Sequence, residues 1–365
     1  MTDFLTELRE ELLDGLERYE RAPRWRRSLA PRGRTLIGPA GRRFAAAVVA
    51  ATAAIAVAVQ VDNRADKVER GTTPPVSRLE GFHAAGGVEA DSSLWVSEWD
   101  LGRLLRIDPR TGTVRARIGV GGSPGIVIAA AGALWIHDWG RGHVLKVDVR
   151  TNRVAKTLAL GLTGEAEIAF AAGAVWAGPD ERGQLVRVDP ETAEVTQRVP
   201  LGGATGAPNA SLAGAGDTLW VVGGAGDVTQ IDARTGRILG RARGPALPLE
   251  TSRRIGADDS GLWISSPERR EIVHIDARTR QPTRFPVAAD PGPLAIVAGR
   301  IWVGTLHDTG TLTRVTVLDT DGHIDATQPV PHPPVQIIPS VSGGAWITFG
   351  ENATLSPAAL RLPDP

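Results

Sequence analysis

The stretch LWVSEWDLGRLLRIDP, residues 94–109, returns forty positions later as LWIHDWGRGHVLKVDV, residues 134–149. In both, a tryptophan near the start is followed 13 residues later by an aspartate that closes an apolar alternation. The tryptophan recurs to the end of the chain at intervals of 39 to 44 residues, at Trp95, Trp135, Trp176, Trp220, Trp263, Trp302 and Trp346. A fixed period of this length is typical of a repeat architecture. The sequence therefore contains seven units.

Within each unit, short runs of alternating apolar residues are bounded by Gly, Pro, Asn and Asp, which predicts strands. In the second unit the four predicted strands are residues 125–130, 133–137, 143–148 and 153–160. Four antiparallel strands in about 40 to 45 residues make one blade of a β-propeller. We expect an all-β, seven-bladed β-propeller with four-stranded antiparallel blades over residues 76–365.

The last unit lacks a fourth strand, because only 19 residues follow Trp346. Ahead of the first unit, the segment PPVSRLEGF resembles the fourth-strand passages of the other units. We therefore predict that a strand from Val76 to Glu80 completes the seventh blade and closes the ring.

The repeated residues have structural explanations. The tryptophans are expected to fill the core between neighbouring blades, because a buried indole removes a large apolar area from water. The aspartates are expected to accept hydrogen bonds from backbone N–H groups two residues on and to fix the hairpin between the third and fourth strands. Gly112, Gly236 and Asn152 suit a left-handed position in that hairpin. Ala193 and Arg280 suit it less well, so another geometry is predicted for their two turns.

The residues before 76 divide into three predicted segments. Residues 44–61 carry no charge and are long enough for a transmembrane helix of about 27 Å. Eight arginines and no acid lie between Arg21 and Arg43, which places the N-terminus in the cytoplasm and the propeller on the extracytoplasmic side of the cell membrane. Residues 62–75 form a polar linker. A cleaved signal peptide is the alternative, since residues 56–58 read Ala-Val-Ala, but 43 residues precede the apolar run.

Residues 1–43 form the predicted cytoplasmic segment. Residues 3–20 show the apolar stripe of an amphipathic helix, and an arginine-rich stretch follows. Two interpretations stay open: the helix docks to a cytoplasmic partner or to a second copy, or it is a marginal helix that lies beside the arginine-rich stretch.

The charge balance of the chain argues against one class of partner. The sequence has 41 basic and 41 acidic residues, and the arginine cluster before the apolar run is explained by membrane topology. We therefore expect no nucleic-acid partner. The chain contains no cysteine, which an exported domain of this size tolerates because it can bury a substantial core.

The run LWV, a short loop, LLRIDPRTGTV and then IGVGGSPGIVI resembles the repeats of the virginiamycin B lyase-like propellers, which are close to the YVTN and NHL repeat propellers. The resemblance covers about residues 76–365. It implies a lyase that uses Mg²⁺ with glutamate and histidine residues on one face of the ring. Glu98 matches the glutamate position. Where the lyase has histidines after a proline, this chain has Gly125, Asn209 and Leu294.

The first two units differ from the others in the residues that follow the repeated tryptophan. They place a second tryptophan at matching positions and surround it with polar residues. Aromatic faces can stack on sugar rings, peptide side chains or cations, while polar groups fix the orientation of a ligand. The predicted ligand-binding residues are Glu98, Trp99, Asp100, His137, Asp138, Trp139 and Arg141. The alternative is that both tryptophans pack across the blade interface and the acids are solvated loop residues.

Two classes of function follow. The first is a membrane-anchored extracytoplasmic scaffold that binds a cell-surface glycan, peptide or protein and needs no cofactor. The second is a metal-dependent lyase-like enzyme, and only this interpretation requires Mg²⁺. The sequence offers one match to the lyase pattern, Glu98, and so favours the scaffold.

Overall fold

A computed structural model of the chain describes residues 78–79, 81–82, 84–202, 210–247, 253–305, 313–349 and 358–365. These residues belong to one compact unit, Thr72–Pro365. The predicted cytoplasmic segment (1–43), transmembrane helix (44–61) and linker (62–75) lie outside the described residues. Within the described ranges, no helix is long and apolar enough to cross a membrane.

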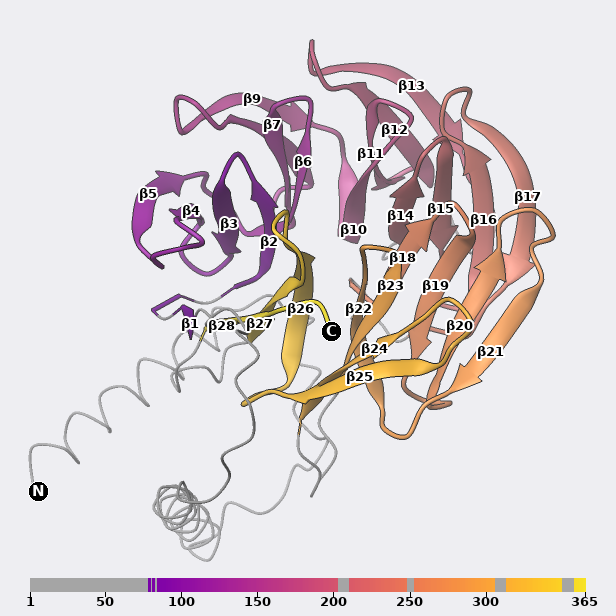
Figure 1. The fold of residues 1–365 in the computed structure, drawn as a ribbon. Helices are drawn as coiled ribbons and strands as arrows, with labels where there is room; N and C mark the ends of the chain where they lie inside the picture. Colours follow the sequence, from indigo (N-terminus) through magenta and orange to yellow (C-terminus); the bar gives the residue numbers. More distant parts are fainter. Residues whose placement is uncertain are drawn as a thin grey trace, which may run out of the picture. The chain divides into compact units, whose positions relative to one another are not determined.

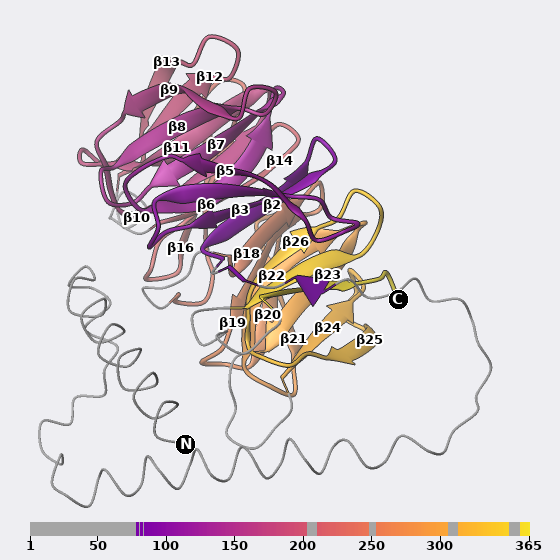
Figure 2. The same ribbon diagram turned by 90° about the vertical axis from the view of Figure 1, so that its left-hand side faces the viewer.

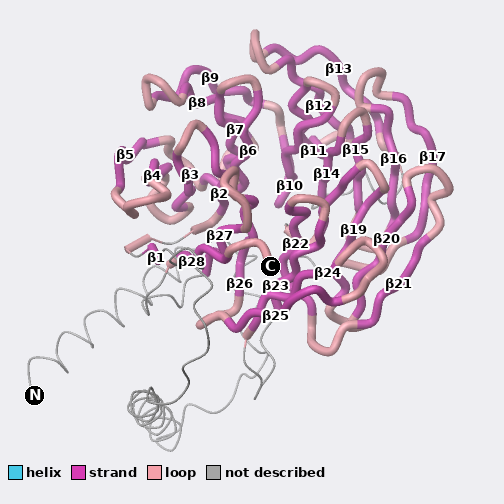
Figure 3. The backbone as a smooth tube through the Cα atoms, viewed as in Figure 1, coloured by secondary structure: helices cyan, strands magenta, loops and turns pink. Residues whose placement is uncertain are grey.

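The described chain folds into seven antiparallel sheets of four strands each, arranged around a common centre (Figures 1 and 3). Blade 1 consists of β2 (Gly86–Ala90), β3 (Ser93–Glu98), β4 (Arg103–Ile107) and β5 (Val114–Gly119). Blade 2 consists of β6 (Pro124–Ala130), β7 (Ala133–Asp138), β8 (His143–Asp148) and β9 (Arg153–Ala159). Blade 3 consists of β10 (Leu162–Ala171), β11 (Ala174–Asp180), β12 (Gln184–Asp189) and β13 (Glu194–Pro200). Blade 4 consists of β14 (Ser211–Ala215), β15 (Thr218–Val222), β16 (Asp227–Asp232) and β17 (Arg237–Arg243). Blade 5 consists of β18 (Ile255–Asp258), β19 (Gly261–Ser266), β20 (Glu271–Asp276) and β21 (Pro282–Pro286). Blade 6 consists of β22 (Pro291–Val297), β23 (Arg300–Thr305), β24 (Arg314–Leu318) and β25 (Ile324–Pro329). Blade 7 consists of β26 (Pro334–Pro339), β27 (Ala345–Phe349), β28 (Ala359–Leu362) and β1 (Arg78–Leu79). The predicted all-β propeller is confirmed.

Two faces of the ring follow from this strand order, and Figure 2 shows the sheets from the side. The entry face is the face of the ring where the first strand of each blade begins and the second strand ends. We call the turn face the one where each third strand is joined to the fourth. The first strands of neighbouring blades, such as β2 and β6 or β10 and β14, contact one another around the centre.

The seven repeated tryptophans form the core between the blades. Each is at most 1% exposed, and each packs with apolar side chains of its own blade and a neighbouring one. Trp135, for example, lies in a cluster with Leu162, Ile168 and Val175 of blade 3. The prediction that these indoles are architectural is confirmed.

The aspartate turns on the turn face are built as predicted. The Oδ1 of Asp108 accepts hydrogen bonds from the backbone N–H groups of Arg110 (2.8 Å) and Thr111 (3.3 Å), and blades 2 to 5 repeat this pattern. In blade 6 the Oδ1 of Asp319 accepts from the N–H groups of Asp321 and His323. These bonds favour the ionised carboxyl group, and the pKa of each turn aspartate is lowered. A backbone N–H is the largest cause in all of them except Asp276, where the Thr279 hydroxyl is.

The prediction of a different geometry for two of these turns is wrong. Ala193 and Arg280 adopt φ values of +53° and +60°, close to the +55° of Asn152 and in the same left-handed region as Gly112. In the turns of blades 1 to 5 the residue at this position donates its N–H to the carbonyl of the aspartate four residues earlier, at 2.8 to 3.0 Å. The hydrogen bonds of the aspartate therefore outweigh the cost of about 1 to 2 kcal/mol for a side chain in this region.

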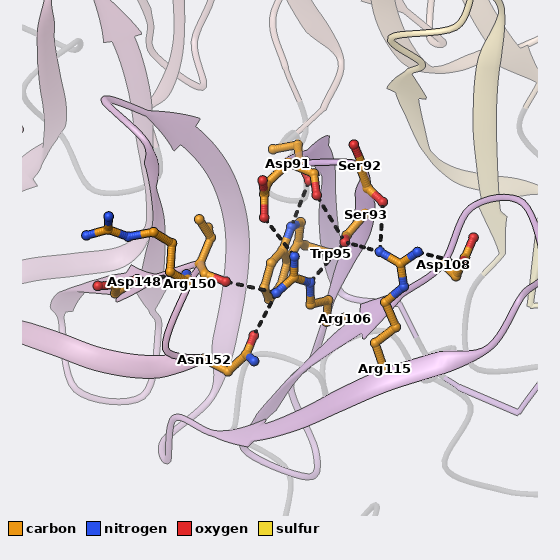
Figure 4. A network of polar contacts seen from close by, with 12 residues as sticks. Asp91, Ser92, Ser93, Trp95, Arg106, Asp108, Arg115, Asp148, Arg150 and Asn152 are labelled. Atoms are coloured by element: carbon orange, nitrogen blue, oxygen red, sulfur yellow. Dashed lines mark hydrogen bonds and ion pairs between the residues drawn. The ribbon is translucent and has the colours of Figure 1, made fainter.

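A cation over the tryptophan joins one blade to the next, which the sequence analysis missed. The residue paired across from the tryptophan on the third strand, two positions before the turn aspartate, is Arg106 in blade 1 and Lys146 in blade 2. Arg106 lies 4.9 Å from the Trp95 ring centroid and donates to Ser93, Asp91 and the blade 2 carbonyl of Val149 (Figure 4). Lys146 lies over Trp135 and donates to the blade 3 carbonyls of Pro190 and Glu191. The recurring pattern of a basic residue, an apolar residue and an aspartate was the available signal.

The ring closes through the segment ahead of the first blade. Arg78 and Leu79 form β1, which pairs with Leu360 and Ala359 of β28 as the outer strand of blade 7. The predicted closure is confirmed for these two residues, whereas Val76, Ser77 and Glu80 lie outside the described ranges. A second connection was not predicted: the buried Nε1 of Trp346 donates to Glu89 of blade 1 at 3.0 Å. First and last blades are thus joined by a strand pair and by a buried hydrogen bond.

Candidate functional site

Three connections meet on the entry face of blades 1 and 2. They are the turn 99–102 between β3 and β4, the turn 139–142 between β7 and β8, and the segment 120–123 between β5 and β6. The carbonyl of Gly102 accepts hydrogen bonds from the N–H groups of Val120 and Gly121, at 2.9 and 2.8 Å. A Cβ on Gly121 would lie 3.2 Å from the Arg141 guanidinium. The segment 120–123 therefore contacts both turns and joins them on this face.

Glu98 is a strand residue and not the exposed loop residue that the sequence suggested. It ends β3, is only 2% exposed, and forms a close ion pair with Arg103, its partner across the β3–β4 ladder. The pKa of Arg103 is raised, chiefly by its hydrogen bond to Glu98. Glu98 therefore holds the base of the turn 99–102.

His137 is fully buried on β7 and fills a position that serine fills elsewhere. Ser97 and Ser265, the corresponding residues of blades 1 and 5, donate their hydroxyl groups to first-strand carbonyls of the next blade, at 2.6 and 2.5 Å. The His137 ring lies against the Ala166 backbone, but neither ring nitrogen makes a hydrogen bond of good geometry. Burial lowers the pKa of His137 to about 3, so the ring is neutral at physiological pH.

Asp138 lies buried beneath the segment 120–123 and holds it in place. Its side chain is 0% exposed, and its Oδ1 accepts hydrogen bonds from the N–H groups of Ser123 (2.9 Å) and Gly140 (3.1 Å). Gly122, at φ +63°, passes so close that a Cβ would lie 2.1 Å from Oδ2. Only glycine fits over this carboxylate. Asp138 thereby fixes the segment 120–123 against the turn 139–142.

The remaining four predicted residues reach the surface. Trp99 and Trp139 are half-buried, whereas Asp100 and Arg141 are exposed. The Trp139 indole packs on Gly125, where a Cβ would lie 2.4 Å from the ring, and meets the His137 ring edge-on at 6.4 Å between centroids. Leu101, which the sequence analysis did not single out, is 54% exposed in the same turn as Trp99.

The structure thus separates the seven predicted residues into two groups. Trp99, Asp100, Trp139 and Arg141 are accessible, whereas Glu98, His137 and Asp138 are buried beneath them. The second group was expected among loop side chains, but the strands β3 and β7 extend through these positions. Their polar atoms are turned into the blade and shape the turns from inside.

The positions that would hold a lyase-type metal ion carry other side chains or are already engaged. A divalent ion of the lyase type would need accessible glutamate and histidine side chains. Glu98 is instead buried against Arg103, and Gly125 and Leu294 follow the prolines. Glu98, Gly125 and Leu294 therefore do not fit that ion. Asp319, Asp321 and His323 offer ligand atoms within 4.8 Å of one another, but Asp319 Oδ1 already accepts the N–H groups of this aspartate turn.

Comparisons with known proteins establish the fold and no more. A family model described as a repeat of unknown function (DUF6923) matches residues 121–246, roughly a third of the chain. No curated protein matches the chain.

Several solved structures share the architecture at low sequence identity. Hydrazine synthase of Kuenenia stuttgartiensis matches with a TM-score of 0.62 and 14% identity over 81% of this chain and 99% of that one. A streptogramin B lyase structure matches with a TM-score of 0.58 and 14% identity, covering 75% and 94%. BamB from Moraxella catarrhalis matches with a TM-score of 0.53 and 13% identity, covering 76% and 83%. Because these identities are so low, the similarity supports the propeller fold and carries no activity over to this chain.

Proposed function

We propose that the chain is a membrane-anchored, extracytoplasmic propeller that binds a ligand or protein partner through the entry face of blades 1 and 2. The observation that carries the proposal is the departure from the repeat at the turns 99–102 and 139–142. Each adds a half-buried tryptophan to a surface that also presents Asp100, Leu101 and Arg141. Propellers with unrelated roles, BamB among them, share this fold, which is consistent with a protein-interaction scaffold.

The buried residues support binding by making the surface rigid. Glu98 and Asp138 fix the bases of the two turns through Arg103 and through the N–H groups of Ser123 and Gly140. A side chain presented by a turn that is already ordered loses less conformational entropy when it binds. The lyase-like alternative is less well supported, because Arg103 already occupies Glu98, the glutamate that a metal would need.

The proposed topology can be tested with reporter fusions. We expect an enzyme that is active only outside the cytoplasm to work when it is fused after residue 75 and to be silent when fused after residue 40. The reason is the arginine cluster between residues 21 and 43, which is retained in the cytoplasm. Activity only in the second fusion would overturn the orientation.

The proposed binding surface can be tested by photo-crosslinking in living cells. A photoreactive amino acid replaces Leu101 in the full chain, and a matched variant carries it at Arg150, an exposed residue on the turn face of blade 2. We expect a discrete adduct from position 101 that disappears when Trp139 is changed to alanine, and none from position 150. Equal labelling from both positions, or no adduct from 101, would contradict the proposal.

A further inference from the structure

The ion pair between Asp138 and Arg141 leaves hydrogen-bonding capacity unused on both sides. The Oδ2 of Asp138 and the Nη1 of Arg141 are 3.9 Å apart, beyond hydrogen-bond distance. Six other arginines on this unit approach their carboxylates to between 2.5 and 3.1 Å: Arg106, Arg115, Arg198, Arg243, Arg270 and Arg300. The pair beside Trp139 is therefore more open than these.

Asp138 has an acceptor oxygen that no residue of the described ranges satisfies. Its Oδ1 is occupied by two backbone N–H groups, but its Oδ2 is buried and makes no hydrogen bond. A buried carboxylate oxygen without a donor is costly, and such an atom indicates a missing water molecule or ligand. The guanidinium of Arg141 lies near this atom, and its side chain is 56% exposed and approaches Gly121.

A hydroxyl group can satisfy both members of the pair. A hydroxyl group can donate its proton to Asp138 Oδ2 while its oxygen accepts a hydrogen bond from Arg141 Nη1. With hydrogen bonds of about 2.8 Å, a separation of 3.9 Å gives an angle of roughly 90° at the hydroxyl oxygen, which is acceptable geometry. A carboxylate ligand could not donate to Asp138, and an ammonium group could not accept from Arg141.

We propose that Asp138, Trp139 and Arg141 form a sugar-binding site, in which one ring hydroxyl bridges Asp138 and Arg141 and the pyranose ring packs against the indole. Trp139 lies between the two polar residues in sequence and is held by Gly125 with part of its surface accessible. The C–H face of a pyranose is apolar and its edge carries hydroxyl groups, so it fits an indole next to a donor and acceptor pair. This inference rests on the proposed function and specifies its ligand as a carbohydrate.

The test measures sugar binding to the full chain in detergent by saturation-transfer NMR and titration. The probes are the methyl pyranosides of glucose, galactose, mannose and N-acetylglucosamine, with sorbitol as a control that has hydroxyl groups but no ring. We expect at least one pyranoside to bind and sorbitol to bind at least tenfold more weakly.

Variants assign the binding to the three residues. Trp139→Ala, Arg141→Ala and Asp138→Asn should each weaken pyranoside binding at least tenfold. Asp138→Asn can keep the acceptor for Ser123 and Gly140, so the turn is preserved. Arg182→Ala, in the corresponding turn of blade 3, where Glu181 stands in place of a tryptophan, should bind like the original chain.

Two results would overturn the inference. If no pyranoside binds, the unused oxygen holds a bridging water only. If a pyranoside binds but Arg141→Ala and Trp139→Ala leave its affinity unchanged, the sugar binds elsewhere. In either case a Trp139-dependent photo-crosslink from position 101 would still support the proposed binding face. If that crosslink is also absent, both proposals are wrong.

Discussion

Replacing Trp135 with alanine is expected to lower the free energy of unfolding of the propeller by about 3 to 5 kcal/mol. The indole is 0% exposed at the junction of blades 2 and 3, so its removal leaves a cavity lined by Leu162 and Ile168. The substitution also removes the ring over which Lys146 is held as it reaches the turn of blade 3.

Urea denaturation of the full chain checks this value, and Trp139→Ala is the matched control. Trp139 lies four positions further along and is half-buried, so its removal is expected to cost about 1 to 2 kcal/mol. Similar losses for the two variants would show that the structure misplaces the division between core and surface indoles.

The stability of the propeller should depend on pH between 6 and 4 through His137. In the unfolded chain this histidine binds a proton near pH 6.5, whereas burial holds its folded pKa at about 3. The unfolded state therefore binds close to one more proton than the folded state across most of this window. Stability falls as the pH falls, by up to roughly 1.4 kcal/mol per pH unit.

Two substitutions isolate this contribution. His137→Ser installs the residue that blades 1 and 5 use at this position, and His137→Gln retains more of the buried volume. Both lack a titrating group, so both should lose the same pH dependence, although their stabilities at pH 7 differ. The turn aspartates titrate equally in all three proteins and cancel in the comparison. Unfolding curves with parallel pH dependence in the original and substituted chains would show that His137 is not buried as a neutral ring.

The sequence predicts most of the ring because its main determinants are periodic. The tryptophans repeat with the blades. An aspartate before a hairpin typically accepts hydrogen bonds from nearby backbone N–H groups of the turn, so its role can be predicted. Ala193 and Arg280 escaped the same reasoning because intrinsic preference disfavours them in a left-handed position. The surrounding hydrogen bonds override that preference.

The candidate site is predicted in position but not in exposure. Trp99 and Trp139 could be found because they depart from the repeat. Whether Glu98 or Asp138 faces solvent depends on where a strand ends, and one residue of difference reverses the side chain. The partners that settle it lie elsewhere in the chain: Arg103 on the next strand, and the N–H of Ser123 in the connection between blades 1 and 2. Such contacts have no local signature in the sequence.

Hydrogen exchange measured on the full chain tests most directly whether the entry face of blades 1 and 2 is a binding surface. The chain is compared in membrane vesicles prepared from the cell that makes it and after purification, by mass spectrometry of peptides that cover the turns. Occupancy predicts slower exchange in the vesicles for residues 99–102 and 139–142, with no change for residues 109–112 and 149–152 on the turn face. Equal exchange in both preparations at the first two turns, or protection confined to the turn face, would contradict the account.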